Sequence, residues 1–207
     1  MQLTHLRSTY DITGPLLMYV GNLERYQGID LLLDSFKLAL TKGSEARLVI
    51  IGGASEHIEY YQRHCQTLGI NAHVDLIGKR PVEDLAHYLA QADILVSPRT
   101  QGHNTPMKLY SYLDSGKALL ATDLPTHTQV LNRHVAWLAS PNAQALSQGM
   151  LHLIQDQDLR ERLGVAAQAL IAKQHTYEVF SDKLTGLYDW LQSHLVGDMQ
   201  PANLSFE

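Results

Sequence analysis

The sequence predicts an α/β fold in which a doubly wound parallel sheet lies between two layers of helices and is followed by carboxyl-terminal helices. Short apolar runs alternate with helical periodicity from about residue 16 to 139, and only helical patterns follow Pro141. Such alternation is typical of parallel strands joined by crossover helices. A chain of 207 residues, of which 45% are hydrophobic, is also long enough to bury one sizeable core.

Six strands are expected, because six apolar runs in the alternating region are short and bounded by polar residues, glycine or proline. Their expected positions are 16–20, 46–53, 73–78, 93–98, 118–122 and 134–139. In the common strand order 3-2-1-4-5-6, the order reverses between the first and fourth strands, and ligands bind outside the strand ends at that point. The segments 21–28 and 97–106 leave those two strands and are therefore predicted to border a cleft.

Glycine, proline and capping residues mark the helices between the first five strands. One helix follows Gly28, the next closes at Gly69, and a third opens with Pro81 and has two acids in its first turn. The fourth is expected to start at Asn104, Thr105 and Pro106 and to stop at Gly116. These ends place each helix between two consecutive strands, as a crossover requires.

Three further helices are expected after residue 141. The last of them, at 177–195, carries an apolar stripe and is therefore expected to pack against another surface. We expect a lead-in over residues 1–15, one ligand-binding domain over 16–196 and a flexible tail over 197–207.

Charge and composition exclude several classes of protein. A net charge of −5 argues against a broad nucleic-acid or anionic-membrane surface. The longest apolar run is far too short to span a membrane, and the first residues lack the apolar region of a signal peptide. The single Cys65 cannot form an internal disulfide and fits a reducing compartment, so we expect a cytoplasmic protein.

Several catalytic motifs are absent from the sequence. The first strand is not followed by G-x-G-x-x-G, and no P-loop, H-E-x-x-H, paired C-x-x-C or G-x-S-x-G is present. The eleven histidines show no metal-ligand spacing, and His127 reads as a loop histidine rather than a ligand. We therefore expect neither a metal nor a bound cofactor.

Five cations collect at the predicted strand ends although the chain as a whole is acidic. They are Arg25, Lys79, Arg80, Arg99 and Lys108. Together with glycines and helix amino termini, such cations favour a phosphate site. The alternative is that surface loops carry Lys and Arg without any ligand.

Lys108 raises a separate question, because it lies in the first turn of a predicted helix, where the helix dipole favours a negative charge. Either Lys108 is a solvated surface residue, or it faces an external anion together with the helix end.

Particular stretches carry a resemblance to a known family. LLMYVGNLERYQGIDLLLDSF, LVIIGG, VDLIGKRPVEDLAHYLAQADILVSPR and, above all, NTPMKLYSYLDSGKALLAT resemble the carboxyl-terminal, donor-binding domain of the retaining glycosyltransferases of family four. The resemblance implies the GT-B architecture, in which two Rossmann-like domains face each other across a cleft and the second holds the nucleotide sugar. The amino-terminal, acceptor-binding domain would then be missing, and any peripheral membrane contact would come from it.

Four positions depart from the pattern of that family. Asn22 and Gln27 stand where relatives commonly have Arg and Lys that hold the diphosphate, and His103 and Ser111 stand where relatives have two glutamates. Two accounts fit: an active transferase whose phosphate site was rebuilt with Arg99, Arg25 and Lys108, or a domain that has lost transfer. We favour the first, because Asn104, Thr105, Pro106 and Lys108 are retained.

The sequence thus predicts the donor half of a metal-independent retaining hexosyltransferase. The base is expected near Lys79 and Arg80, the diphosphate near 21–28 and Lys108, and the sugar near 102–104. The predicted donor contacts are Gly21, Asn22, Arg25, Gln27, Gly53, Lys79, Arg80, Arg99, Gly102, Asn104, Thr105 and Ser111, with His103 and Lys108 as catalytic residues. The alternatives are a catalytically silent nucleotide-sugar-binding or protein-interaction domain and, third, an epimerase or phosphorylase of the same architecture.

Overall fold

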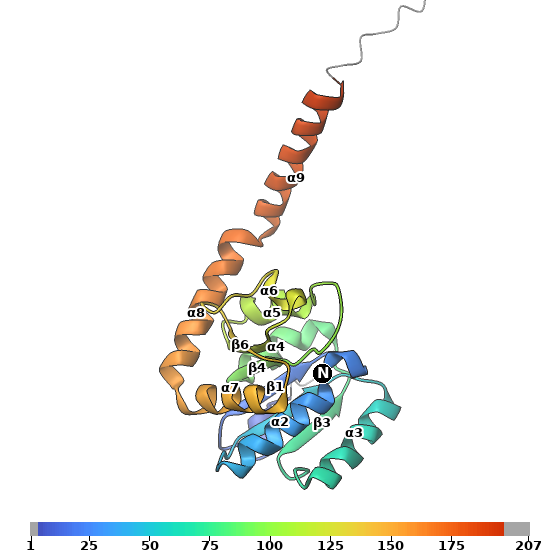
Figure 1. The fold of residues 1–207 in the computed structure, drawn as a ribbon, viewed down its shortest axis with the longest axis vertical. Helices are drawn as coiled ribbons and strands as arrows, with labels where there is room; N and C mark the ends of the chain where they lie inside the picture. The colour runs from blue at the N-terminus through green and yellow to red at the C-terminus, as the bar shows by residue number, and fades with distance from the viewer. Residues whose placement is uncertain (1–3, 197–207) are drawn as a thin grey trace, which may run out of the picture.

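A computed structural model describes residues 4–196 and shows a six-stranded, wholly parallel sheet with helices on both faces (Figure 1). The strand order is β3-β2-β1-β4-β5-β6, as the sequence predicted. The strands are β1 Leu16–Val20, β2 Arg47–Ile51, β3 Val74–Gly78, β4 Ile94–Ser97, β5 Ala118–Thr122 and β6 Trp137–Ala139. The order reverses at β1, which pairs with β2 on one side and with β4 on the other.

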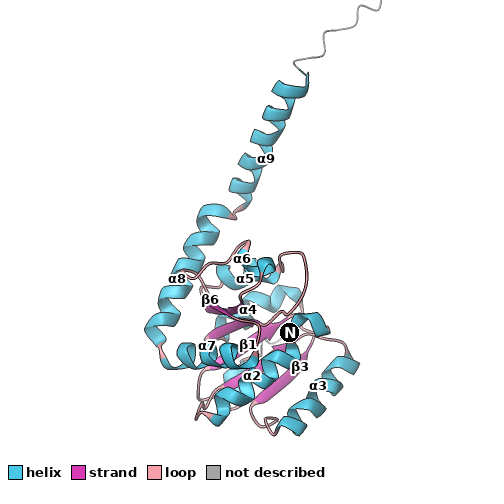
Figure 2. Ribbon diagram, viewed as in Figure 1, coloured by secondary structure: helices cyan, strands magenta, loops and turns pink. Residues whose placement is uncertain are grey.

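Helices connect the strands and follow the last one (Figure 2). The α-helices are α1 Leu6–Thr9, α2 Ile29–Thr41, α3 Ser55–Leu68, α4 Leu85–Gln91, α5 Lys108–Asp114, α6 Pro125–Thr128, α7 Ala143–Gln155, α8 Gln157–Gln174 and α9 Tyr177–Leu191. The 3₁₀ turns η1 Arg25–Gln27 and η2 Val82–Asp84 precede α2 and α4, and the π-helical turn η3 Gln192–Val196 follows α9.

Two apolar cores lie on opposite faces of the sheet. Successive side chains of a strand point to opposite faces, so Leu17 packs in the core that includes Phe36 of α2, and Met18 packs in the core that includes Leu109 of α5. All four side chains are fully buried. The two cores hold the sheet rigid, so that the loops at the ends of its strands start from defined positions.

The fourth crossover helix begins later than the sequence predicted. α5 starts at Lys108, and residues 104–107 are not helical. The cause is that the Asn104 side chain, which was expected to help start the helix, accepts a hydrogen bond from Arg99 at 3.1 Å. Thr105, likewise, donates its hydroxyl to Gln129 at 2.5 Å.

The two ends of the chain differ in how they pack. The predicted lead-in contains α1, whose Leu6 is fully buried. α9 instead extends away from the sheet (Figure 1), and none of its residues is buried. The apolar stripe expected to pack is exposed: Phe180 is 59% and Tyr188 63% accessible. The predicted tail at 197–207 lies outside the described residues. Among residues 4–196, no helix is both long enough and apolar enough to cross a membrane.

Candidate functional site

A hollow of about 400 Å³ opens at the carboxyl ends of β1, β2 and β3. Its lining includes five of the predicted donor contacts, namely Gly21, Asn22, Gly53, Lys79 and Arg80. The hollow lies beside the reversal of strand order at β1 and β4, where ligands of doubly wound sheets bind. The structure therefore brings these five residues together at the predicted edge of the sheet.

Close backbone contact shapes the floor of this hollow. A side chain at Gly52 would place its Cβ 2.1 Å from the carbonyl oxygen of Gly21, and the φ angle of Gly52 is +115°. Both conditions demand glycine, because L-residues with a side chain rarely adopt this backbone conformation. The backbones of the loops after β1 and β2 are thus in close contact, and both loops line the hollow that a ligand would enter.

Lys108 reaches the same edge from the first turn of α5. Its Nζ donates hydrogen bonds to the Tyr19 hydroxyl at 2.9 Å and to Oε1 of Gln27 at 3.1 Å. The ammonium also lies 4.0 Å from the centroid of the Tyr19 ring, and a Cβ at Gly21 would lie 2.8 Å from Nζ. Lys108 is therefore not a solvated surface lysine. The partners it does have, a phenol and an amide, are neutral.

The electrostatic state of Lys108 follows from that setting. None of the ion pairs within residues 4–196 includes Lys108. Burial, and then the nearby Arg99 charge, lower the pKa of Lys108 from 10.5 to about 7. Burial also raises the pKa of the Tyr19 phenol, so Tyr19 stays neutral and donates its own proton to the Asn22 carbonyl at 2.6 Å. An anion next to Nζ would favour the charged form of the lysine.

Arg99 organises the loop between β4 and α5. Its guanidinium donates to the carbonyl oxygen of Gln101 at 2.7 Å, to that of Asn104 at 2.8 Å and to Oδ1 of Asn104 at 3.1 Å. Arg99 is 6% accessible, and the Tyr26 ring centroid lies 5.2 Å from its central carbon. A Cβ at Gly102 would collide with the guanidinium at 2.5 Å. The sequence placed Arg99 among the donor contacts, whereas in the structure its bonds hold the loop.

The other predicted site residues lie outside the hollow. Arg25 lines a separate groove of about 690 Å³ with Tyr26 and Asp30. Ser111 lines a third hollow, of about 390 Å³, near α4. His103 is exposed on the loop that Arg99 organises. The five predicted cations thus do not form one cluster, because Arg25 lies in a different hollow and Arg99 lies inside a loop.

Two residues near the site were missed or misread from the sequence. Tyr19 carries the one hydroxyl in the apolar run LLMYV, which is the signal that could have identified it as a polar group at the strand end. His127 was read as a loop residue, but it lies in α6 and is fully buried. Burial lowers the pKa of His127 from 6.5 to about 4, so its imidazole is neutral at pH 7.

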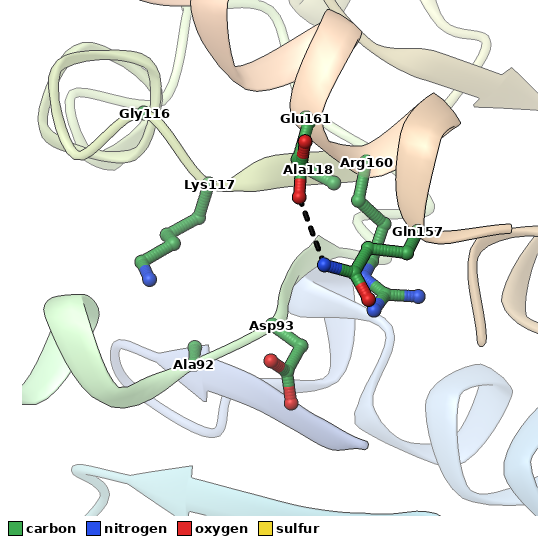
Figure 3. Close-up of a pocket in the computed structure, with 8 residues that line it drawn as sticks. All are labelled: Ala92, Asp93, Gly116, Lys117, Ala118, Gln157, Arg160 and Glu161. Carbon is green, nitrogen blue, oxygen red and sulfur yellow. Dashed lines mark hydrogen bonds between the residues drawn. The ribbon is translucent and has the colours of Figure 1, made fainter.

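A smaller hollow of about 200 Å³ lies at the amino ends of β4 and β5 (Figure 3). Three of its polar side chains, those of Asp93, Gln157 and Arg160, are bound within the chain. Asp93 accepts from the backbone N–H of Leu16 at 2.7 Å, Arg160 donates to the carbonyl oxygen of Leu153 at 2.6 Å, and Gln157 donates to Glu161 at 2.9 Å. These bonds hold the start of β1, the end of α7 and the first turn of α8, so these side chains have a structural role.

Comparison with known sequences supports the resemblance. The family model described as "Glycosyl transferases group 1" matches residues 7–170. The phosphatidyl-myo-inositol mannosyltransferase of Mycobacterium tuberculosis is 24% identical over 187 residues, which cover 87% of this chain and 48% of that protein. The chain thus spans about half the length of the curated relatives it matches.

Solved structures share the fold. A crystal structure of HepE from Anabaena in complex with UDP-glucose superposes with a TM-score of 0.80 at 16% identity, covering 90% of this chain and 52% of that one. The carboxyl-terminal domain of LpcC, a group 1 family protein from Francisella tularensis, gives a TM-score of 0.71 at 16% identity and covers 82% of this chain and 91% of that domain. At this identity the likeness shows the fold alone.

Proposed function

The chain belongs to the glycosyl transferases group 1 family, and from this premise we propose that it is the donor-binding half of a retaining glycosyltransferase. The proposed enzyme transfers a hexosyl group from a nucleoside-diphosphate sugar to an acceptor. The observation that carries the proposal is Lys108, a partly buried ammonium with neutral partners at the edge where strand order reverses.

A diphosphate supplies what the surroundings of Lys108 lack. Burying an ammonium without a counter-charge is unfavourable, and hydrogen bonds between ions are stronger than those between neutral groups. A diphosphate oxygen near Gly21 would exchange the neutral partners of Lys108 for a charged one. That exchange is favourable for an anion and not for a neutral ligand.

The rest of the donor follows from the position of the phosphates. We place the base beside Lys79 and Arg80 in the 400 Å³ hollow, and the sugar beside His103 on the loop that Arg99 organises. Catalysis would stabilise the negative charge that develops on the departing diphosphate, with Lys108 as the nearest cation and no metal ion required.

A second candidate is a binding domain that has lost transfer. Its support is that Gln27 offers Lys108 a neutral amide at a position where the resemblance implies a cation, and that Ser111 lies in a different hollow from Lys79 and Arg80. Such a domain would bind a nucleotide sugar without transferring the sugar, or would bind another protein.

The acceptor side belongs to a second domain in this proposal. The chain spans about half the length of its curated relatives, and α9 presents an apolar stripe that the described part of the chain does not cover. Leu187, for example, is 52% accessible. We propose that α9 packs against the domain that binds the acceptor, and that any membrane contact is made through that domain.

Calorimetry with UDP, GDP, ADP and their sugars tests the donor site. We expect one nucleotide series to bind, and Lys108→Ala to weaken the diphosphate at least about ten-fold, while the matching nucleoside changes by less than about three-fold. The matched control is Lys117→Ala, at the opposite edge of the sheet, which should change neither. No binding of any ligand at millimolar concentration, or equal weakening of diphosphate and nucleoside, contradicts the proposal.

A further inference from the structure

The short helix α6 is tied to both ends of the loop between β4 and α5. At the start of the loop, Thr122 donates its hydroxyl to the carbonyl oxygen of Arg99 at 2.6 Å, and His127 of α6 lies against Thr122. At the end of the loop, the hydroxyl of Thr105 donates to the side chain of Gln129, the residue after α6, at 2.5 Å. The loop is thus held from α6 at its two ends.

The hydrogen bonds around His127 define one tautomer. Nδ1 lies 2.7 Å from the carbonyl oxygen of Thr122, which accepts and cannot donate, so Nδ1 carries the proton. Nε2 must then accept, and the hydroxyl of Ser97 at 2.9 Å donates to it. The donors therefore run in one direction: Ser97 donates to His127, and His127 donates to the carbonyl oxygen of Thr122. The hydroxyl of Thr122, which lies 3.1 Å from Nδ1 of His127, donates to the carbonyl oxygen of Arg99. Ser97, Thr122 and His127 are each at most 1% accessible, so water does not compete for these bonds.

This series of buried hydrogen bonds is less favourable for stability than apolar packing would be. A buried polar group is destabilising unless every partner is in place, and apolar side chains of similar size would fill the same space without that risk. What the polar chain adds is a single orientation for the backbone at Arg99. The guanidinium of Arg99 then holds the carbonyl oxygens of Gln101 and Asn104.

We propose that His127 is a positioning residue for the donor sugar, which fixes, through Thr122 and Arg99, the loop that carries Gly102, His103 and Asn104. This inference rests on the proposed function, because that function places the sugar beside this loop. His127 itself is fully buried, so its side chain is not exposed to a ligand in the hollow. Its effect is therefore expected on the sugar part of the donor and not on the nucleotide part.

The test uses the nucleotide series that binds in the calorimetry above, which is UDP and UDP-glucose or the corresponding GDP or ADP pair. It compares binding to the 207-residue chain and to the variants Thr122→Val and His127→Leu. Thr122→Val keeps the shape of the side chain and the carbonyl oxygen that accepts from His127, but removes the hydroxyl that donates to Arg99 and lies 3.1 Å from Nδ1 of His127. We expect the ratio of the Kd for the nucleotide sugar to the Kd for the nucleoside diphosphate to rise about ten-fold in each variant, as loss of a buried hydrogen-bond partner predicts. The double variant should show no further rise, because both changes cut one chain.

Two further measurements separate positioning from a general loss of stability. Phe36→Leu, in the core on the other side of the sheet from α5, should lower stability without changing the hydrogen bonds of His127 and Thr122. It should therefore leave the Kd ratio unchanged. Hydrogen exchange of amides 99–105 should accelerate in Thr122→Val and not in Phe36→Leu. If His127→Leu does not fold, Thr122→Val alone decides. An unchanged Kd ratio in Thr122→Val overturns the inference, whereas failure of the unmodified chain to bind any of UDP, GDP, ADP and their sugars counts against the proposed function itself.

Discussion

Gln27 accepts a hydrogen bond from Lys108 at 3.1 Å, so a neutral amide occupies the place beside the ammonium that a ligand phosphate would take in the proposed site. Gln27 is 8% accessible and is therefore buried beside Lys108. A charge introduced at position 27 would therefore act directly on the affinity of the site for an anionic ligand.

Gln27→Glu should stabilise the unliganded protein and weaken diphosphate binding. A carboxylate beside Lys108 would form an ion pair in a partly buried place, where such pairs are stronger than at the surface, and would repel a phosphate. We expect a higher melting temperature and an affinity for the diphosphate at least about ten-fold lower. Gln27→Met, which removes the amide without adding charge, is the control; if it weakens the diphosphate as much as Gln27→Glu does, charge is not the cause.

Lys108 should make stability and ligand binding depend on pH. Its pKa is lowered from 10.5 to about 7 on folding, so between pH 7 and 10.5 the unfolded chain holds more protons and stability rises with pH. The slope is at most about 1.4 kcal/mol per pH unit for one group. A diphosphate favours the charged lysine, so binding at pH 8 should take up protons. Calorimetry in buffers of different ionisation enthalpy measures this uptake, which Lys108→Met should abolish.

His127 should act in a separate, acidic window. Because its pKa falls from 6.5 to about 4 on folding, the unfolded chain binds the extra proton between these values, and stability declines as the pH drops from 6.5 towards 4. Urea unfolding of the unmodified chain and of His127→Leu between pH 4 and 7 measures the difference in slope. Parallel pH profiles for the two proteins would mean that His127 does not contribute.

Gly52→Ala should destabilise the protein much more than Gly43→Ala. Both glycines have positive φ angles, but a Cβ at Gly52 would meet the Gly21 carbonyl at 2.1 Å, while a Cβ at Gly43 meets nothing within 4 Å. We expect a loss of about 1–2 kcal/mol at Gly43 and of about 3 kcal/mol or more at Gly52, where steric strain is added. Denaturant unfolding checks this, and equal losses would contradict the contact between the two loops.

The exposure of α9 predicts a null result in one variant. Leu187→Gln should change the stability of this chain by less than about 0.5 kcal/mol, as exposed substitutions usually do. Leu153→Ala, in the fully buried core, should cost about 2–5 kcal/mol. A large loss in Leu187→Gln would show that the α9 stripe is covered in solution.

Local patterns were sufficient to predict the sheet. Alternating apolar runs and helical periodicity located the six strands, and the usual order for such alternation matched the observed one. The start of α5 was predicted too early because the Asn104 side chain, which would have helped start the helix, instead accepts a hydrogen bond from Arg99. Turn and cap signals are local, and they do not register a competing partner five residues away.

The candidate site was harder to predict, because its side chains meet through distant contacts. The partners of Lys108 lie 81 and 89 residues away in the chain. Residues on the loop after β1 and at the end of β3 do share one hollow, as the strand order implies. No sequence spacing indicates, however, that Arg99 turns back into its own loop or that His127 packs between Ser97 and Thr122. Their roles, and those of all donor contacts, stay predictions that the experiments above test.

The bond between Lys108 and Tyr19 passes over the edge of the sheet, because Tyr19 packs in the core with α2 while Lys108 belongs to α5 on the opposite face. This hydrogen bond thus links the helical layers on the two faces of the sheet. A ligand that takes Lys108 as its own partner would have to break the bond between Lys108 and Tyr19. Ligand binding at Lys108 would then change how firmly the first turn of α5 is attached to the helices on the other face of the sheet.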